Sequence, residues 1–78
     1  MTHQQISTIR ITKTGEDRYR VVVNDEVTQV DEPDLDGSKL EGMLRRKALI
    51  GVTPEEVLSL LDKREVGFQM NVDYDRIL

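Results

Sequence analysis

Hydrophobic and polar residues alternate in two N-terminal segments of the chain, and this pattern predicts two β-strands. In residues 6–13, Ile9 and Ile11 alternate with polar residues, which is the period of a strand with one buried face. In residues 18–24, RYRVVVN, the tyrosine and two valines share a face, and β-branched residues favour a strand. Residues 14–17 contain a glycine and predict a turn between the two strands.

The next segment, residues 26–32, predicts a third and more polar strand at the edge of a sheet. Asn24–Asp25 can form the tight turn that precedes it, because both residue types tolerate positive φ. The pattern allows a loop of two or of three residues here. The length of the loop decides which face of the strand Val27 and Val30 share. Pro33 is expected to end the strand, because proline cannot donate a hydrogen bond to the ladder.

Apolar residues then recur at helical spacing in two segments, which predicts two helices. Ser38 begins a capping box, SKLE, and the first helix is expected to run to about Ile50. Gly51 is expected to end it in a left-handed conformation. In the second helix, residues 53–56 combine a threonine cap, a proline in the first turn and a glutamate at the capping-box position. The basic residues 63–64 suit the negative end of its dipole.

Residues 66–74 contain five apolar residues in strict alternation with polar ones, which predicts a fourth strand that pairs with the first three. The expected order is β-β-β-α-α-β. This order indicates an α+β fold, with a small antiparallel sheet of about four strands and two helices packed on one face. A chain of 78 residues suffices for one domain, so we expect residues 1–78 to form a single domain.

The composition excludes several kinds of site. The chain has no cysteine and one histidine, His3, so neither a disulfide nor a structural zinc site is expected. No apolar run approaches the roughly 20 residues of a membrane-spanning helix. The N-terminus has no apolar signal core, so we expect a cytoplasmic protein. Because no nucleophile has a well-placed base and no catalytic motif occurs, we expect neither an enzyme nor a cofactor.

The segment DEPDLDGSKLEGM, residues 31–43, has acids spaced as in a calcium loop. Counted from Glu32, the acids and Gly37 match the first half of an EF-hand loop. Met43 then occupies the position of the bidentate glutamate, and its side chain cannot ligate calcium. The same acids fit the start of a helix, where the dipole favours negative charge. We therefore expect no metal site here.

The charged residues form blocks, although the net charge is only -4. Alternation places one set of side chains opposite the apolar strand faces, and we call this set the arginine face: Arg10, Arg18, Arg20 and Val22. The acids that follow the second strand form a second set, which we call the acidic strip: Asp31, Glu32, Asp34 and Asp36. Blocks of opposite charge commonly pair with each other as solvated surface in the fold. Either set could instead be a binding surface.

Two classes of function remain open. The first is a protein–protein interaction or regulatory module, because Ile6 and Val22 beside arginines are typical of an interface. Its acidic strip could bind a basic partner, and a homodimer could bury Ile6 and Val22. The alternative is a nucleic-acid-binding, transcription-related protein that uses the arginine face as a dimer. The acidic first turn of the second helix disfavours a helix-turn-helix, and the negative net charge opposes non-specific nucleic-acid binding. The residues indicate no particular family.

Overall fold

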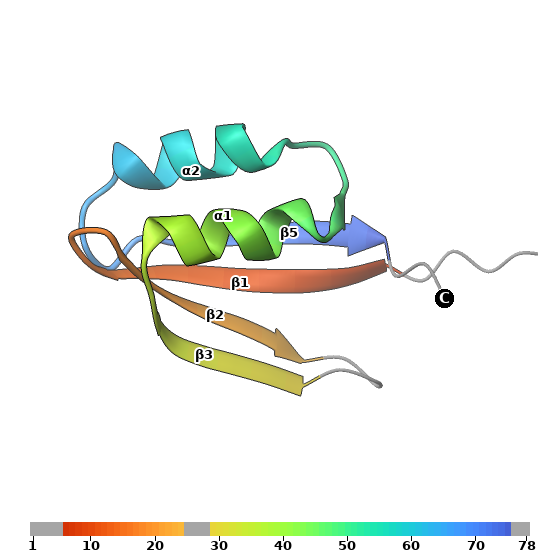
Figure 1. Ribbon diagram of the computed structural model, residues 1–78, viewed down its shortest axis with the longest axis horizontal. Coiled ribbons are helices and arrows are strands. Elements are labelled where there is room, and N and C mark those ends of the chain that lie inside the picture. Colours follow the sequence, from red (N-terminus) through yellow and green to blue (C-terminus); the bar gives the residue numbers. More distant parts are fainter. Residues whose placement is uncertain (1–5, 25–28, 76–78) are drawn as a thin grey trace, which may run out of the picture.

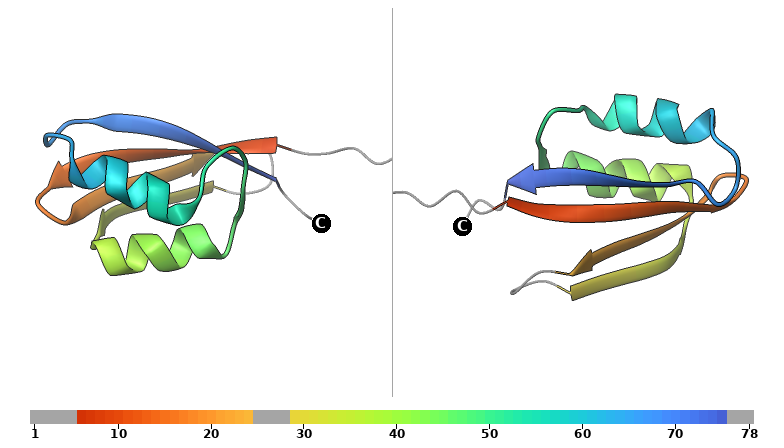
Figure 2. Two further views of the ribbon diagram at one scale, coloured as in Figure 1. Left: turned by 90° about the horizontal axis from the view of Figure 1, so that it is seen from above. Right: turned by 180° about the vertical axis from the view of Figure 1, so that it is seen from behind.

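The computed structural model describes residues 6–24 and 29–75 and has an α+β fold with five strands and two helices (Figure 1). The strands are β1 (Ile6–Gly15), β2 (Arg18–Asn24), β3 (Gln29–Leu35), β4 (Ala48–Leu49) and β5 (Gln69–Asp75). The helices are α1 (Gly37–Arg45) and α2 (Pro54–Asp62). All strand pairs are antiparallel, and the sheet order is β3-β2-β1-β5-β4. Both helices lie over the same face of the sheet (Figure 2).

The core lies between this sheet face and the helices, as the alternation predicts. Ile9, Ile11 and Val21 are fully buried on the central strands. Leu40, Leu44 and Leu61 are fully buried beneath the helices. The two N-terminal strands and their buried faces are therefore confirmed, and so are the α+β class and the two helices.

The start of α1 differs from the prediction. The N-cap is Asp36 and not Ser38, because the Asp36 carboxylate accepts a hydrogen bond from the backbone N–H of Lys39 at 2.8 Å. Gly37 precedes Ser38 inside the first turn, and its backbone N–H donates to the carboxylate of Asp17 at 3.0 Å. The first helix thus begins closer to the β1–β2 turn than the capping-box motif indicates.

The end of α1 also differs, since the helix stops at Arg45 and not near Ile50. Ala48 and Leu49 form the short strand β4, which pairs with the last two residues of β5. The backbone N–H of Ile50 then donates to the carbonyl of Asp73 at 2.9 Å. This pairing draws the chain out of the helix and adds a fifth strand to the predicted four. Gly51 has the expected positive φ, 82°, but in the loop after β4.

The third strand runs through Pro33 to Leu35, so the prediction that Pro33 ends it is wrong. An edge strand tolerates proline, because its outer N–H groups have no ladder partner to lose. The register shifts between Tyr19 and Val21, so that two residues of β3 lie opposite Arg20, as in a β-bulge. Asp25 of the predicted Asn24–Asp25 turn lies outside the described residues, and so does Val27.

The last strand, β5, begins at Gln69 and not at Val66. Val66 is 60% exposed and precedes a turn in which Gly67 has a φ of 100°. β5 pairs with β1 along its whole length, from Ile6 opposite Asp75 to Thr12 opposite Gln69. The prediction that this strand completes the sheet of the first three is confirmed, and it lies beside the first strand.

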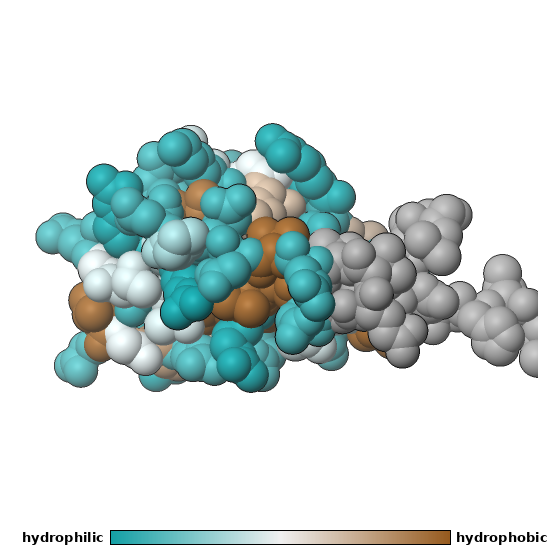
Figure 3. All heavy atoms as spheres, turned by 90° about the horizontal axis from the view of Figure 1, so that it is seen from below, coloured by the Kyte–Doolittle hydropathy of each residue, from teal (hydrophilic) through white to brown (hydrophobic). Residues whose placement is uncertain are grey.

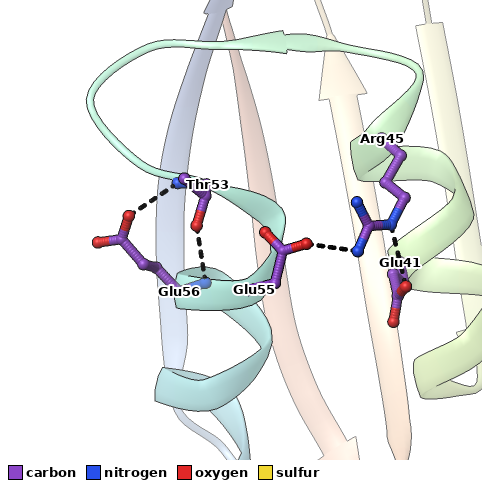
Figure 4. Close-up of polar contacts among 5 residues, drawn as sticks. All are labelled: Glu41, Arg45, Thr53, Glu55 and Glu56. Carbon is purple, nitrogen blue, oxygen red and sulfur yellow. Dashed lines mark hydrogen bonds and ion pairs between the residues drawn. The ribbon is translucent and has the colours of Figure 1, made fainter.

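The predicted cap of the second helix is confirmed (Figure 4). The backbone N–H of Glu56 donates to the hydroxyl of Thr53 at 3.2 Å, and the Glu56 carboxylate accepts from the backbone N–H of Thr53 at 3.2 Å. Pro54 occupies the first turn. Arg45 of α1 pairs with Glu41 of its own helix and with Glu55 of α2, and so links the two helices at this end.

The C-terminal end of α2 is stabilised by a residue that the sequence analysis did not identify. Lys13 of β1 is 9% exposed, and its ammonium donates to the carbonyl oxygens of Leu61 at 3.0 Å and Arg64 at 2.9 Å. A third carbonyl, that of Asp62, lies 3.5 Å away. A cation at this end is favoured by the helix dipole. The buried cation at the end of α2 is thus Lys13, whereas the predicted residues 63–64 are exposed.

On the side of the molecule formed by β3, most of the surface is hydrophilic, and these hydrophilic residues surround a smaller hydrophobic area (Figure 3). Val30 of β3 is only partly buried against the core. Neither helix in the described part of the chain is long and apolar enough to cross a membrane.

Candidate interaction surface

The sheet face opposite the helices is not covered by any described element (Figure 2, right). We call it the open face. Alternation places on it the residues that are out of phase with the core: Ile6, Thr8, Arg10 and Thr12 of β1, Arg18, Arg20 and Val22 of β2, and Gln69, Asn71 and Asp73 of β5. The structure therefore brings together all four residues of the arginine face.

Arg20 forms a two-point contact with Asp31 on the open face. Its Nε donates to one carboxylate oxygen of Asp31 at 3.0 Å and its Nη2 donates to the other at 2.7 Å. This hydrogen bond is the main cause that raises the pKa of Arg20 and lowers the pKa of Asp31. Asp31 lies directly opposite Val22 in the register, so the guanidinium of Arg20 lies diagonally beside Val22.

Arg18 pairs more loosely with Asp34, with 3.6 Å between Nη1 and Oδ1. Asp31 and Asp34 are three residues apart and would point to opposite faces of a regular strand. The bulge opposite Arg20 adds one residue to β3 and places both carboxylates on the open face. Two arginines of the arginine face are thus paired with two acids of the acidic strip.

Arg10 is exposed and forms no ion pair with a described residue. It lies between Asn71 of β5 and Val22 of β2 in the register, so these side chains form one row across the sheet. On the β5 side, Asp73 accepts a hydrogen bond from the hydroxyl of Thr8 at 2.9 Å. Among the three arginines of the open face, Arg10 is therefore the one whose charge remains available.

The structure separates two groups that the sequence analysis placed together. Ile6 is 55% exposed but lies four residues along β1 from Arg10, the residue opposite Val22, at a distance of about 13 Å along the strand. Ile6 and Val22 therefore do not form one apolar patch. The acidic strip is also divided, because Glu32 lies opposite the core residue Val21 and Asp36 caps α1.

The pairing of Arg20 with Asp31 gives a testable titration. The Asp31 carboxyl has a lowered pKa in the folded chain, so its contribution to stability is present above its unfolded pKa and is lost as the pH falls through the folded value. We expect Arg20→Met to raise the pKa of Asp31 towards its ordinary value. Carboxyl ¹³C shifts followed by NMR against pH measure this change.

Arg18→Met is the matched control, because it removes a neighbouring arginine and leaves the main partner of Asp31 in place. An Asp31 carboxyl that already titrates at its ordinary value in the unmodified protein would contradict the assigned pairing.

Within residues 6–24 and 29–75, no group of three or more His, Cys, Asp or Glu side chains could hold a metal ion. No model of a protein family matches the chain. A search of the curated proteins finds no significant match, and neither does a search of the solved structures.

Proposed function

We propose that the protein is a non-enzymatic, cytoplasmic protein–protein interaction module that binds a partner protein through the open face. The observation that supports this proposal is the arrangement around Val22. This half-buried valine has Arg10, which pairs with no described acid, on one side and the paired Arg20 and Asp31 on the other. An apolar centre with arginine beside it is the composition of an interface core.

The charges of the open face define the chemistry of the partner. Arg20 is already paired with Asp31 and Arg18 with Asp34, whereas Arg10 has no such partner in the described part of the chain. A complementary surface would present a carboxylate opposite Arg10 and an aliphatic side chain against Val22. The ion pairs restrict these side chains before binding, Arg20 more than Arg18, which lowers the entropic cost of association.

The same pairs weigh against the nucleic-acid alternative. Phosphates are bound by neutralising them with free Lys and Arg side chains. A phosphate that binds Arg20 or Arg18 would have to displace Asp31 or Asp34, which leaves Arg10 alone for such a contact on the open face. Asp73 adds a further carboxylate on the β5 side. The arrangement therefore favours a protein partner over nucleic acid.

A capture experiment with two variants tests the proposal. The tagged protein captures partners from nuclease-treated lysate of its source organism, and the affinity of each purified partner is then measured by calorimetry. We expect Arg10→Glu to weaken the affinity at least tenfold, because it places like charge against the carboxylate of the partner. Val22→Thr tests the apolar contact with little change of shape.

Arg46→Glu is the control, since it makes the same charge change on an exposed residue just after α1. A partner that binds Arg10→Glu and Arg46→Glu equally would refute the role of the open face. Material that the protein captures from untreated lysate, but not from nuclease-treated lysate, would favour nucleic acid as the partner instead. Light scattering gives the molar mass of the purified protein. If the unmodified protein has the mass of a dimer and Arg10→Glu has the mass of a monomer, the partner at the open face is a second copy of the chain.

A further inference from the structure

A second candidate site lies on the other side of the sheet, between the two helices. α1 and α2 run antiparallel and side by side (Figure 1), and an open cleft of about 640 Å³ lies along them. This volume is in the range of ligand sites, which is about 300–1,000 Å³. Its lining is about equally polar and apolar, with small residues between the helices and carboxylates near one end: Gly37, Ser38, Gly42, Ser59, Asp17 and Asp62.

The packing of the helices does not require the glycine in the middle of α1. A Cβ built on Gly42 would meet no heavy atom within 4 Å. Glycine inside a helix weakens the helix relative to alanine, and this position has space for the Cβ of an alanine. The effect of glycine at this position is to leave the wall of the cleft free of a side chain.

The carboxylates of Asp17 and Asp62 lie at the end of the cleft where α1 starts and α2 ends, and the Lys13 ammonium donates to backbone carbonyls at the same end of α2. The Asp17 carboxylate is fixed there by the backbone N–H of Gly37, and Asp62 forms no ion pair with a described residue. The basic residue of the lining, Arg45, lies at the opposite end. It is paired there with Glu41 of α1 and with Glu55 of α2 (Figure 4).

A tyrosine of the core also lines this cleft. Tyr19 lines the cleft and is only 4% exposed, yet no described residue forms a hydrogen bond with its hydroxyl. In the open cleft this hydroxyl can accept a hydrogen bond from water or from a ligand. Burial raises the pKa of the Tyr19 hydroxyl, and the charges of Asp17 and Asp62 raise it further. The hydroxyl therefore lies within electrostatic reach of the two carboxylates at the acidic end.

We infer that this cleft binds an arginine side chain from a basic segment of a partner protein. The guanidinium would donate to the carboxylates of Asp17 and Asp62 and to the hydroxyl oxygen of Tyr19. Arginine suits three separate acceptors because its planar group carries five N–H donors. The bare backbone at Gly42 leaves room for the aliphatic stem. The cleft and the open face lie on opposite sides of the sheet, so this inference does not depend on the proposed function.

A peptide titration followed by NMR tests the inference on the whole protein. The probe is the peptide acetyl-Gly-Arg-Gly-Arg-Gly-amide, and its comparison carries citrulline, the neutral analogue of arginine, in place of both arginines. We expect saturable shifts of the backbone amides of Gly37, Gly42 and Ser59 with the arginine peptide. The citrulline peptide should bind at least tenfold more weakly, because a charge-assisted contact is lost.

Three variants separate binding from folding. Gly42→Gln fills the cleft with a good helix former, so its Tm should stay the same or rise by a few degrees while the peptide shifts disappear. Asp62→Asn and Tyr19→Phe should each weaken binding severalfold. Glu65→Gln removes an exposed carboxylate that does not line the cleft and should leave binding unchanged.

Several results would overturn the inference. Shifts that do not saturate, or equal shifts with the citrulline peptide, would show that the cleft does not recognise the guanidinium. Unchanged binding to Gly42→Gln would place the peptide elsewhere on the molecule. Each result is read from residue-specific amide shifts, and therefore holds whether or not the open face binds a partner.

Discussion

Leu61→Ala should lower the free energy of unfolding by about 3 kcal/mol, because a buried leucine truncated to alanine loses its transfer energy and leaves a cavity. Leu61 is fully buried at the end of α2, beneath the helix and against the sheet. A domain of this size has a total stability of roughly 4–12 kcal/mol. The substitution should therefore remove a large share of the stability, which urea unfolding followed by circular dichroism measures directly.

The neighbouring residue provides the control for this prediction. Leu60 is in the same helix but only half-buried. The same truncation at Leu60 should cost about 1 kcal/mol, because less apolar surface is lost. Equal losses at Leu60 and Leu61 would contradict the position of the core beneath α2.

Lys13→Met should lower the stability by about 2 kcal/mol, although methionine keeps the length and the apolar stem of the side chain. The cost arises from the carbonyl oxygens of Leu61 and Arg64, which lose a charged donor at a buried helix end. For a domain of this size we expect a fall in Tm of about 10 °C. Differential scanning calorimetry measures this change.

Lys63→Met is the matched control, since Lys63 is the C-cap of the same helix but is exposed. Its replacement should change the stability by less than about 0.5 kcal/mol, as is usual for surface positions. If the two lysine variants unfold at the same temperature, Lys13 does not stabilise the end of α2.

Local sequence signals predicted much of the fold because they depend on neighbouring residues. The alternation around Ile9, Ile11 and Val21 identified two strands with their buried faces, and Thr53 to Glu56 identified the start of α2. The same alternation placed Arg10 and Val22 on the face away from the core. In each case the local pattern and the tertiary environment favour the same structure.

The errors occur where distant parts of the chain decide the structure. The end of α1 depends on the pairing of Ala48 and Leu49 with β5, which no pattern around residues 45–50 reveals. The N-cap is Asp36, two residues before Ser38, which the capping-box motif indicated. Short signals of this kind cannot determine which of two adjacent caps the chain uses.

The candidate site was predicted only in part, for similar reasons. The bulge in β3 places Asp31 and Asp34 on one face, so the arginine face and the acidic strip pair with each other. The sequence signal for this register shift is Pro33, which lies in the bulge, but the sequence analysis took it as the end of the strand. Lys13 had a usable signal, because it continues the alternation of Ile9 and Ile11 on the buried face. A lysine in such a position needs acceptors from elsewhere in the fold.

The pairing of the first strand with the last one bears on how the protein is made. Ile6 lies opposite Asp75, so the central strand pair joins residues from the two ends of the described chain. During synthesis, one edge of β1 has no strand partner until β5 has left the ribosome. Non-local pairing of this kind is also slow. An unpaired edge is prone to aggregation, which charged residues oppose. Arg10 lies on the open face of β1 and Lys13 on its buried face, so both faces of the strand carry a positive charge, and we expect these residues to protect the nascent chain during this interval.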